Sequence, residues 1–152
     1  MRFAVLGSGS GGNSTIVECD GEYLLVDAGL SAKQLNLRLE RLHVAPEQLS
    51  GILLTHEHGD HIRGLDVFLR KCPVPILASI MTSRVVKEGL RESVEWILFE
   101  SGQKFSWKGF DFTTFPLPHD AVEPVGYVIA RGDIALGLRP IWGMLMLKSL
   151  RP

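Results

Sequence analysis

The chain has 152 residues, 45% of them hydrophobic, which is enough to bury one core, so we expect a single domain. Its 16 basic and 17 acidic residues give a formal net charge of −1. This balance excludes an overall basic surface for binding nucleic acid, although a local groove could still hold a phosphate.

The sequence also bears on the compartment of the protein. The N-terminal apolar run reaches Gly7 too soon to be a secretory signal, and no later run is long enough to span a bilayer. The two cysteines, Cys19 and Cys72, are too few and too far apart to indicate a disulfide framework. We therefore expect a cytoplasmic protein with reduced, buried cysteines, no membrane association and no disulfide-linked partner.

A short first strand is expected over residues 2–6, and a loop rich in glycine and serine follows over residues 7–14. Successive backbone N–H groups in such a loop could surround an anion. The loop lacks the Lys-Ser/Thr pair of a P-loop. A tight connection between two strands accounts for the glycines equally well.

Two further strands are expected over residues 15–19 and 23–26, separated by Asp20-Gly21, a dipeptide that favours a tight hairpin turn. The second strand ends at Asp27, which opens a turn-forming Asp-x-Gly sequence. A capping box from Ser31 to Gln34 then begins a helix. Its predicted buried face consists of leucines at helical spacing, Leu35, Leu39 and Leu42.

Three of the five histidines lie within residues 55–61, together with two carboxylates. His56 and His58 alternate after a short apolar run, so a strand would point both rings to one side. Asp60 and His61 fall on the turn that opens the next helix, where they can face the same cavity. Imidazole nitrogen and carboxylate oxygen suit zinc, and also iron or manganese. The motif predicts a metal site, and a histidine-rich polar loop is the alternative.

The rest of the chain alternates between helix and strand. Apolar residues at helical spacing after the motif predict a helix, and they are Ile62, Leu65, Leu69 and Cys72. A strand over 76–79, a helix over 81–90 and a strand over 94–99 follow, which is the pattern of an α/β sandwich.

A hairpin is then expected over residues 103–107 and 110–115. It leads to His119, which lies between prolines and next to an aspartate. From the residues alone, His119 could be a surface histidine that titrates near neutrality.

The pattern His-x-His-x-Asp-His after a buried strand resembles the signature of the metallo-β-lactamase fold hydrolases. The resemblance implies an α/β fold of the αββα-sandwich type, with only its N-terminal part present. The resemblance is strong evidence for the fold but weak evidence for the substrate, because the family includes lactamases, thioester hydrolases, phosphodiesterases and nucleases.

The resemblance also implies roles for individual residues. The ligands of a first metal would be His56, His58 and His119, and those of a second metal Asp60 and His61. Zn²⁺ is the metal we expect first, with Mn²⁺ or Fe²⁺ as alternatives, and a complete family member would hold up to two ions. Asp27 would lie under the site and orient the ligands, and a plain turn residue is the alternative.

The opening loop and the run 119–127 are similar to the YycJ/WalJ-type branch of the fold, a group regarded as DNA exonucleases. The similarity implies metal-assisted hydrolysis of phosphodiesters, with nucleic acid as substrate and a metal-activated water as nucleophile. Two alternatives stay open. One is hydrolysis of another ester, a thioester or a lactam, and the other is a metal-binding remnant without turnover.

The chain departs from the family after residue 138. Family members supply a bridging aspartate and a further C-terminal histidine, but this chain has no histidine beyond His119, and residues 139–152 contain no acidic residue. If the reading frame started at the third base of the Arg139 codon, the codons for residues 139–144 would permit the sequence Thr-Asp-Leu-Gly-His. We therefore expect an incomplete domain over 1–138 and an aberrant tail over 139–152, produced by a single-base slip. A natural short form and a divergent end are the alternatives.

This departure has consequences for the chemistry. The three histidines could still hold one metal with an open position for water, and Asp60 could act as a base or as a weak ligand. Low activity is expected. An incomplete sandwich should also expose apolar surface and an unpaired sheet edge, through which the protein would self-associate.

Overall fold

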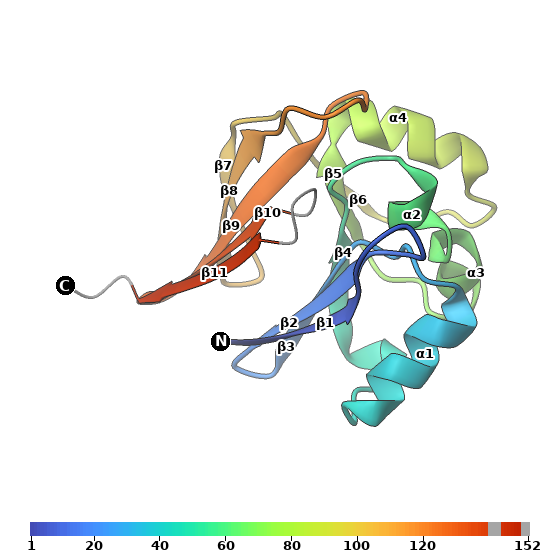
Figure 1. The fold of residues 1–152 in the computed structure, drawn as a ribbon, viewed down its shortest axis with the longest axis horizontal. Helices are drawn as coiled ribbons and strands as arrows, with labels where there is room; N and C mark the ends of the chain where they lie inside the picture. The colour runs from blue at the N-terminus through green and yellow to red at the C-terminus, as the bar shows by residue number, and fades with distance from the viewer. Residues whose placement is uncertain (140–143, 150–152) are drawn as a thin grey trace.

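A computed structural model describes residues 1–139 and, as a strand, residues 144–149. Two sheets face each other, and helices cover the outer face of the first sheet (Figure 1). The six-stranded first sheet has the order β1-β2-β3-β4-β5-β6, and the five-stranded second sheet has the order β11-β10-β9-β8-β7. The predicted α/β class is confirmed, with helix, sheet and sheet layers of the αββα sandwich.

The first sheet is antiparallel at one edge and parallel in its remaining part, since β1, β2 and β3 pair antiparallel while β3 to β6 pair parallel. Its strands are β1 (Arg2–Gly7), β2 (Ser14–Cys19), β3 (Glu22–Val26), β4 (Leu49–Leu53), β5 (Ile76–Ser79) and β6 (Trp96–Phe99). Asp20 and Gly21 form the two-residue hairpin turn, with φ values of 53° and 80°. Every residue of β4 and β5 is buried, as expected for central parallel strands.

The helices connect the parallel strands and are α1 (Ala32–Arg41), the 3₁₀ turn η1 (Pro46–Gln48), α2 (Gly59–Ile62), α3 (Leu65–Lys71) and α4 (Ile80–Gly89). The Ser31 side chain caps α1 by accepting a hydrogen bond from the Gln34 backbone N–H. Leu35 and Leu39 are buried as predicted, but Leu42 is 42% exposed because α1 ends before it. None of the helices in the described ranges is long and apolar enough to cross a membrane.

The prediction of a single helix after the motif is wrong in one respect. It is divided into α2 and α3, and Gly64 lies at the break. A Cβ atom at Gly64 would lie 2.0 Å from the Leu30 carbonyl oxygen, so the backbone of this break packs directly on the segment after β3. The Gly64 backbone N–H also donates to the Ala28 carbonyl oxygen. The close approach holds the motif loop against the end of β3.

The second sheet is antiparallel throughout. Its strands are β7 (Lys104–Trp107), β8 (Phe110–Pro116), β9 (Val125–Arg131), β10 (Ile134–Arg139) and β11 (Met144–Ser149). The predicted tail over 139–152 falls mostly outside the described residues, apart from Arg139 and the backbone of β11, which pairs with β10. The predicted domain boundary and the base slip therefore stay predictions.

Two apolar cores hold the layers together. One lies between the helices and the first sheet and includes Leu35, Leu39 and Phe68. The other lies between the sheets and includes Phe112 and Tyr127. Each fully buried side chain of this size stabilises the fold by roughly 1.5–3 kcal/mol relative to an exposed one. The packed sheets fix the ends of β4 and β8, from which the candidate site is built.

Candidate metal centre

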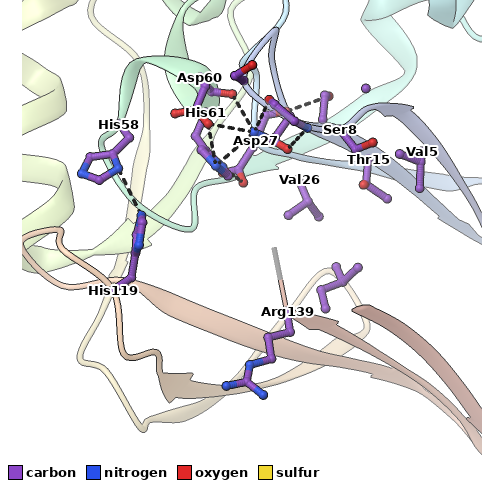
Figure 2. A pocket seen from close by; sticks show the side chains of 16 residues that line it. Val5, Ser8, Thr15, Val26, Asp27, His58, Asp60, His61, His119 and Arg139 are labelled. Carbon is purple, nitrogen blue, oxygen red and sulfur yellow. Dashed lines mark hydrogen bonds and ion pairs between the residues drawn. The ribbon is translucent and has the colours of Figure 1, made fainter. Parts of the chain in front are cut away.

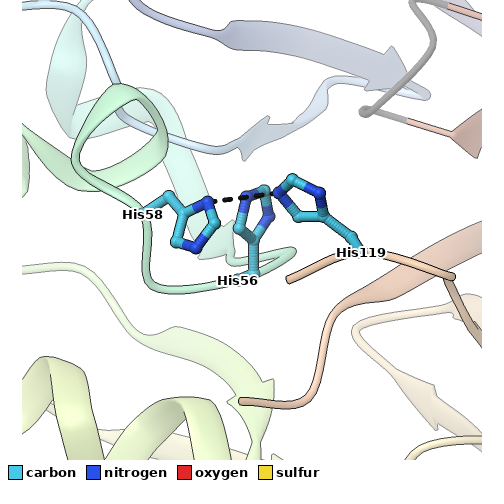
Figure 3. Close-up of side chains that lie close together, drawn as sticks. All are labelled: His56, His58 and His119. Atoms are coloured by element: carbon cyan, nitrogen blue, oxygen red, sulfur yellow. Dashed lines mark hydrogen bonds between the residues drawn. The ribbon is translucent and has the colours of Figure 1, made fainter. Parts of the chain in front are cut away.

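Three histidines from two distant segments meet at one edge of the sandwich. His56 and His58 lie in the loop after β4, and His119 lies in the loop after β8 (Figure 3). Their candidate ligand atoms all lie within 4.8 Å of one another, and His119 Nε2 is 3.1 Å from His58 Nδ1. The strand predicted to carry His56 and His58 ends at Leu53, but the loop still brings both rings together.

His56 is the most enclosed of the three, since it is 1% exposed. Its Nε2 atom is buried and has no hydrogen-bond partner among the described residues. Burial first, and then the neighbouring imidazoles of His61, His58 and His119, lower the pKa of His56 to about 3. A neutral imidazole with an unused nitrogen is the form that binds a metal, so the donor set fits a divalent ion.

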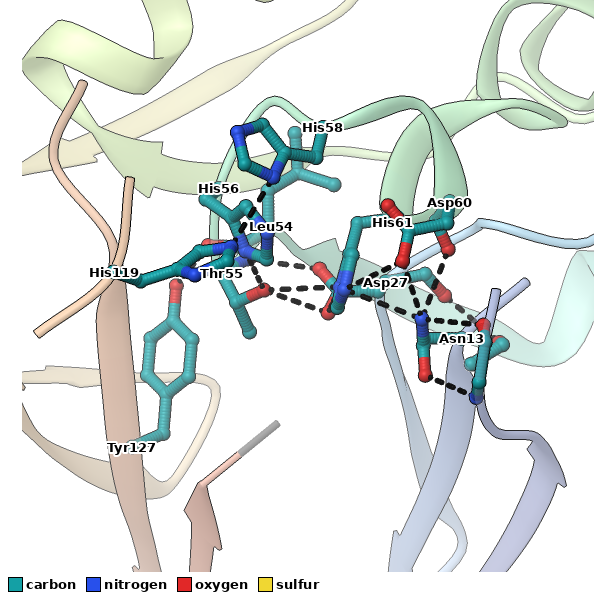
Figure 4. A network of polar contacts seen from close by, with 12 residues as sticks. Asn13, Asp27, Leu54, Thr55, His56, His58, Asp60, His61, His119 and Tyr127 are labelled. Atoms are coloured by element: carbon teal, nitrogen blue, oxygen red, sulfur yellow. Dashed lines mark hydrogen bonds and ion pairs between the residues drawn. The ribbon is translucent and has the colours of Figure 1, made fainter. Parts of the chain in front are cut away.

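Asp27 forms the base of a second cluster beside these rings. Its carboxylate is 2% exposed and accepts hydrogen bonds from the Thr55 backbone N–H at 2.8 Å and the Thr55 hydroxyl at 2.7 Å (Figure 4). It also lies 2.7 Å from His61 Nδ1. Burial lowers the pKa of His61, but the hydrogen bond to Asp27 and its charge outweigh burial and raise it overall. Asp27 thus fixes the orientation of the His61 ring, with Nε2 directed away from it.

Asp60 lies with His61 and not within the cluster of three histidines. Its Oδ2 atom is 3.6 Å from His61 Nε2, and its side chain is 34% exposed. The His56 and His61 ring centroids are 4.0 Å apart, so the two clusters are adjacent. The structure therefore brings all the predicted site residues to one region, divided into a group of three histidines and a group around Asp27.

Asn13 is a residue of this region that the sequence did not point to. Its Nδ2 atom donates to Asp60 Oδ2 at 3.0 Å and lies 3.2 Å from His61 Nε2. Its Oδ1 atom accepts from the Gly9 backbone N–H, and its backbone N–H donates to the Asp60 carbonyl oxygen at 2.7 Å. The position of Asn13 in the sequence does not indicate that it contacts the motif, because its contacts with Asp60 and His61 depend on the fold of the glycine-rich loop.

A cavity of about 550 Å³ opens over both clusters (Figure 2). One wall is the glycine- and serine-rich loop, including Ser8 and Ser10, and Arg139 of β10 lines the cavity as well. His58, Asp60 and His119 face the same space. The loop thus borders the site, and His58, His61 and His119 line the cavity.

The chain was compared with known proteins. The family model described as "Metallo-beta-lactamase superfamily" matches residues 7–143. Exodeoxyribonuclease WalJ of Streptococcus pneumoniae is 37% identical over 137 residues, which cover 88% of this chain and 51% of that protein. Exodeoxyribonuclease YycJ of Bacillus anthracis is 36% identical over 140 residues, covering 91% and 53%.

Solved structures give the same fold. The metallo-beta-lactamase fold protein YhfI from Bacillus subtilis superposes with a TM-score of 0.74 at 20% identity, covering 89% of this chain and 59% of that one. The subclass B3 metallo-beta-lactamase MEM-A1 from a soil metagenome gives a TM-score of 0.71 at 17% identity, covering 95% and 58%. The chain spans about half the length of the curated relatives that it matches.

Proposed function

Because this chain belongs to the metallo-beta-lactamase superfamily, we propose that it is a metal-dependent hydrolase that cleaves phosphodiester bonds of DNA as an exonuclease. The observation that carries the proposal is the convergence of three histidine side chains, two of which, His58 and His119, line an open cavity. The relatives named exodeoxyribonucleases, at 36–37% identity, support DNA as the substrate class.

The proposed metal ligands are His56, His58 and His119, with Zn²⁺ as the first choice and Mn²⁺ or Fe²⁺ as alternatives. We propose one ion in this chain, because these three histidines are the one group of three or more clustered candidate ligands among the described residues. A divalent metal held by these histidines would supply Lewis-acid catalysis and an activated water.

The protein's own residues would prepare the reaction. Thr55 and His61 are held by the buried carboxylate of Asp27, which keeps the motif loop in place. We propose that Asp60 acts as the base, because its partly exposed carboxylate lines the cavity. In this step the water oxygen bonds to phosphorus, its proton passes to Asp60, and the bond from phosphorus to the leaving sugar oxygen breaks. That oxygen takes up a proton from solvent.

A cytoplasmic location is part of the proposal. It is supported by the two cysteines, Cys19 and Cys72, which are both buried and free of disulfide bonds. Free buried cysteines are typical of a reducing compartment.

The proposal is tested by a nuclease assay on end-labelled single- and double-stranded DNA with added Mn²⁺ or Zn²⁺. The variant His58→Ala removes a proposed metal ligand and should lose most of the cleavage activity. Asp60→Asn should lose at least about 100-fold in rate, which is the usual contribution of a general base. His43→Asn is the matched control, because His43 is an exposed histidine after α1 with a φ of 57°, which asparagine tolerates. Equal cleavage by His58→Ala and the unaltered chain would contradict the proposal.

A further inference from the structure

Glu57 stands between His56 and His58 in the motif, but its side chain has a different partner. Its Oε1 atom accepts a hydrogen bond from the Val122 backbone N–H at 2.9 Å. Val122 lies three residues after His119, in the loop between β8 and β9. The middle residue of the motif therefore contacts the segment that carries the third histidine.

This loop has few other attachments at its tip. At its base, the Leu117 N–H donates to the Pro124 carbonyl oxygen, and the Val125 N–H donates to the Thr55 carbonyl oxygen at 3.0 Å. Pro118 and Pro124 have no N–H to donate. Between them, the Ala121 N–H donates within the loop, to the His119 carbonyl oxygen.

Among the described residues, the bond from Val122 to Glu57 is therefore the shortest backbone attachment of the tip to the rest of the protein, beside the 3.1 Å contact between the His119 and His58 rings. A longer contact of 3.5 Å joins the Thr82 hydroxyl to the Glu123 carbonyl oxygen. The other carboxylate oxygen of Glu57, Oε2, is buried without a partner among the described residues. Burial of such an oxygen is unfavourable, and the hydrogen bond from the Val122 N–H to Oε1 is the described interaction that offsets this cost.

We propose that Glu57 is a positioning residue for the metal centre, which holds the His119 loop so that the His119 ring stays beside the rings of His56 and His58. The inference rests on the proposed role of His119 as a metal ligand. Groups that orient metal ligands typically change metal affinity by about 10–100-fold when they are removed. Glu57 would act in this way through the backbone, without contact to the metal or the substrate.

Three variants of the full chain test the proposal by competition titration with Zn²⁺ and a chromophoric chelator. Glu57→Ala should weaken Zn²⁺ binding by about 10–100-fold. Glu57→Gln keeps an acceptor oxygen and should restore affinity to within a few-fold of the unaltered chain. The matched control is Glu18→Ala, because Glu18 also accepts a backbone N–H, from Gly21 at 3.1 Å, but lies far from the site in the β2–β3 hairpin.

Two readouts separate positioning from a general loss of stability. Hydrogen exchange of the Val122 amide in the metal-free protein should accelerate in Glu57→Ala but not in Glu18→Ala. The visible absorption spectrum of the Co²⁺ form should also change in Glu57→Ala and return in Glu57→Gln. Unaltered Zn²⁺ affinity and Co²⁺ spectrum in Glu57→Ala would overturn the proposal.

His119→Ala distinguishes failure of this inference from failure of the proposed function. If His119→Ala weakens Zn²⁺ binding while Glu57→Ala does not, the three-histidine site stands and the role of Glu57 is wrong. If His119→Ala binds Zn²⁺ as tightly as the unaltered chain, both the proposed ligand set and the role of Glu57 are wrong.

Discussion

Asp27 offers the most quantitative test of how the site is held. Its buried carboxylate receives both Thr55 donors and lies 2.7 Å from the His61 ring nitrogen. In Asp27→Ala these donors would be left buried without an acceptor. Removing one partner of a buried ionic or hydrogen-bonded group costs about 3–5 kcal/mol. Alanine would also have to adopt the φ of 61° at this position, which costs roughly 1–2 kcal/mol.

The expected loss in the free energy of unfolding for Asp27→Ala is therefore about 4–7 kcal/mol, a large part of the 5–15 kcal/mol of a typical domain. Urea unfolding in the presence of a chelator, followed by circular dichroism, measures this loss without a contribution from metal. Asp27→Asn keeps one acceptor oxygen and tolerates the left-handed backbone, so it should lose less than half as much.

Asp20→Ala is the matched control for the backbone contribution. Asp20 has a φ of 53°, but its side chain is 73% exposed and, among the described residues, pairs with Arg131 at 3.1 Å. It should lose only about 1–2 kcal/mol. If Asp27→Ala were destabilised by no more than Asp20→Ala, the buried carboxylate would not hold the motif loop, and the reasoning would be refuted.

Three further variants test separate features of the fold. Gly29→Ala should strongly reduce the folded yield or the Tm, since the added Cβ would lie 1.7 Å from the Asp60 carbonyl oxygen. Gly89→Ala should be tolerated, because a Cβ added there would meet no atom within 4 Å. Tyr127→Phe removes the donor to the buried Leu54 carbonyl oxygen, at 2.5 Å, and should cost about 1–3 kcal/mol in urea unfolding. Phe3→Lys should decrease self-association in light scattering, because Phe3 is 40% exposed on the edge strand β1. A monomeric unaltered chain at working concentration would count against exposed-edge association.

Much of the fold could be predicted because its local signals agree with its tertiary structure. The Asp20-Gly21 turn, the alternation of strands and helices, and the hairpin across Lys108-Gly109 all occur where the sequence places them. The helix after the motif was predicted as one element because periodicity does not register a close backbone contact. Gly64 breaks it through the approach to the Leu30 carbonyl oxygen.

The candidate site was predictable only where chemistry and spacing coincide. His56 and His58 stand together in the sequence, so residue types indicated a metal site there, and the resemblance to the family added His119. Asn13 and Glu57 could not be found in this way. Their roles depend on which polar groups the fold brings within hydrogen-bond distance, and these partners are 47 and 65 positions away in the chain.

The central claim is that His56, His58 and His119 form one metal site. Elemental analysis of the purified chain, beside His58→Ala and the control His43→Asn, tests it most directly. The account predicts about one divalent metal per chain in the unaltered protein and in His43→Asn, and a loss of most of it in His58→Ala. Absence of bound metal after incubation with Zn²⁺, or equal metal content in His58→Ala, would contradict it.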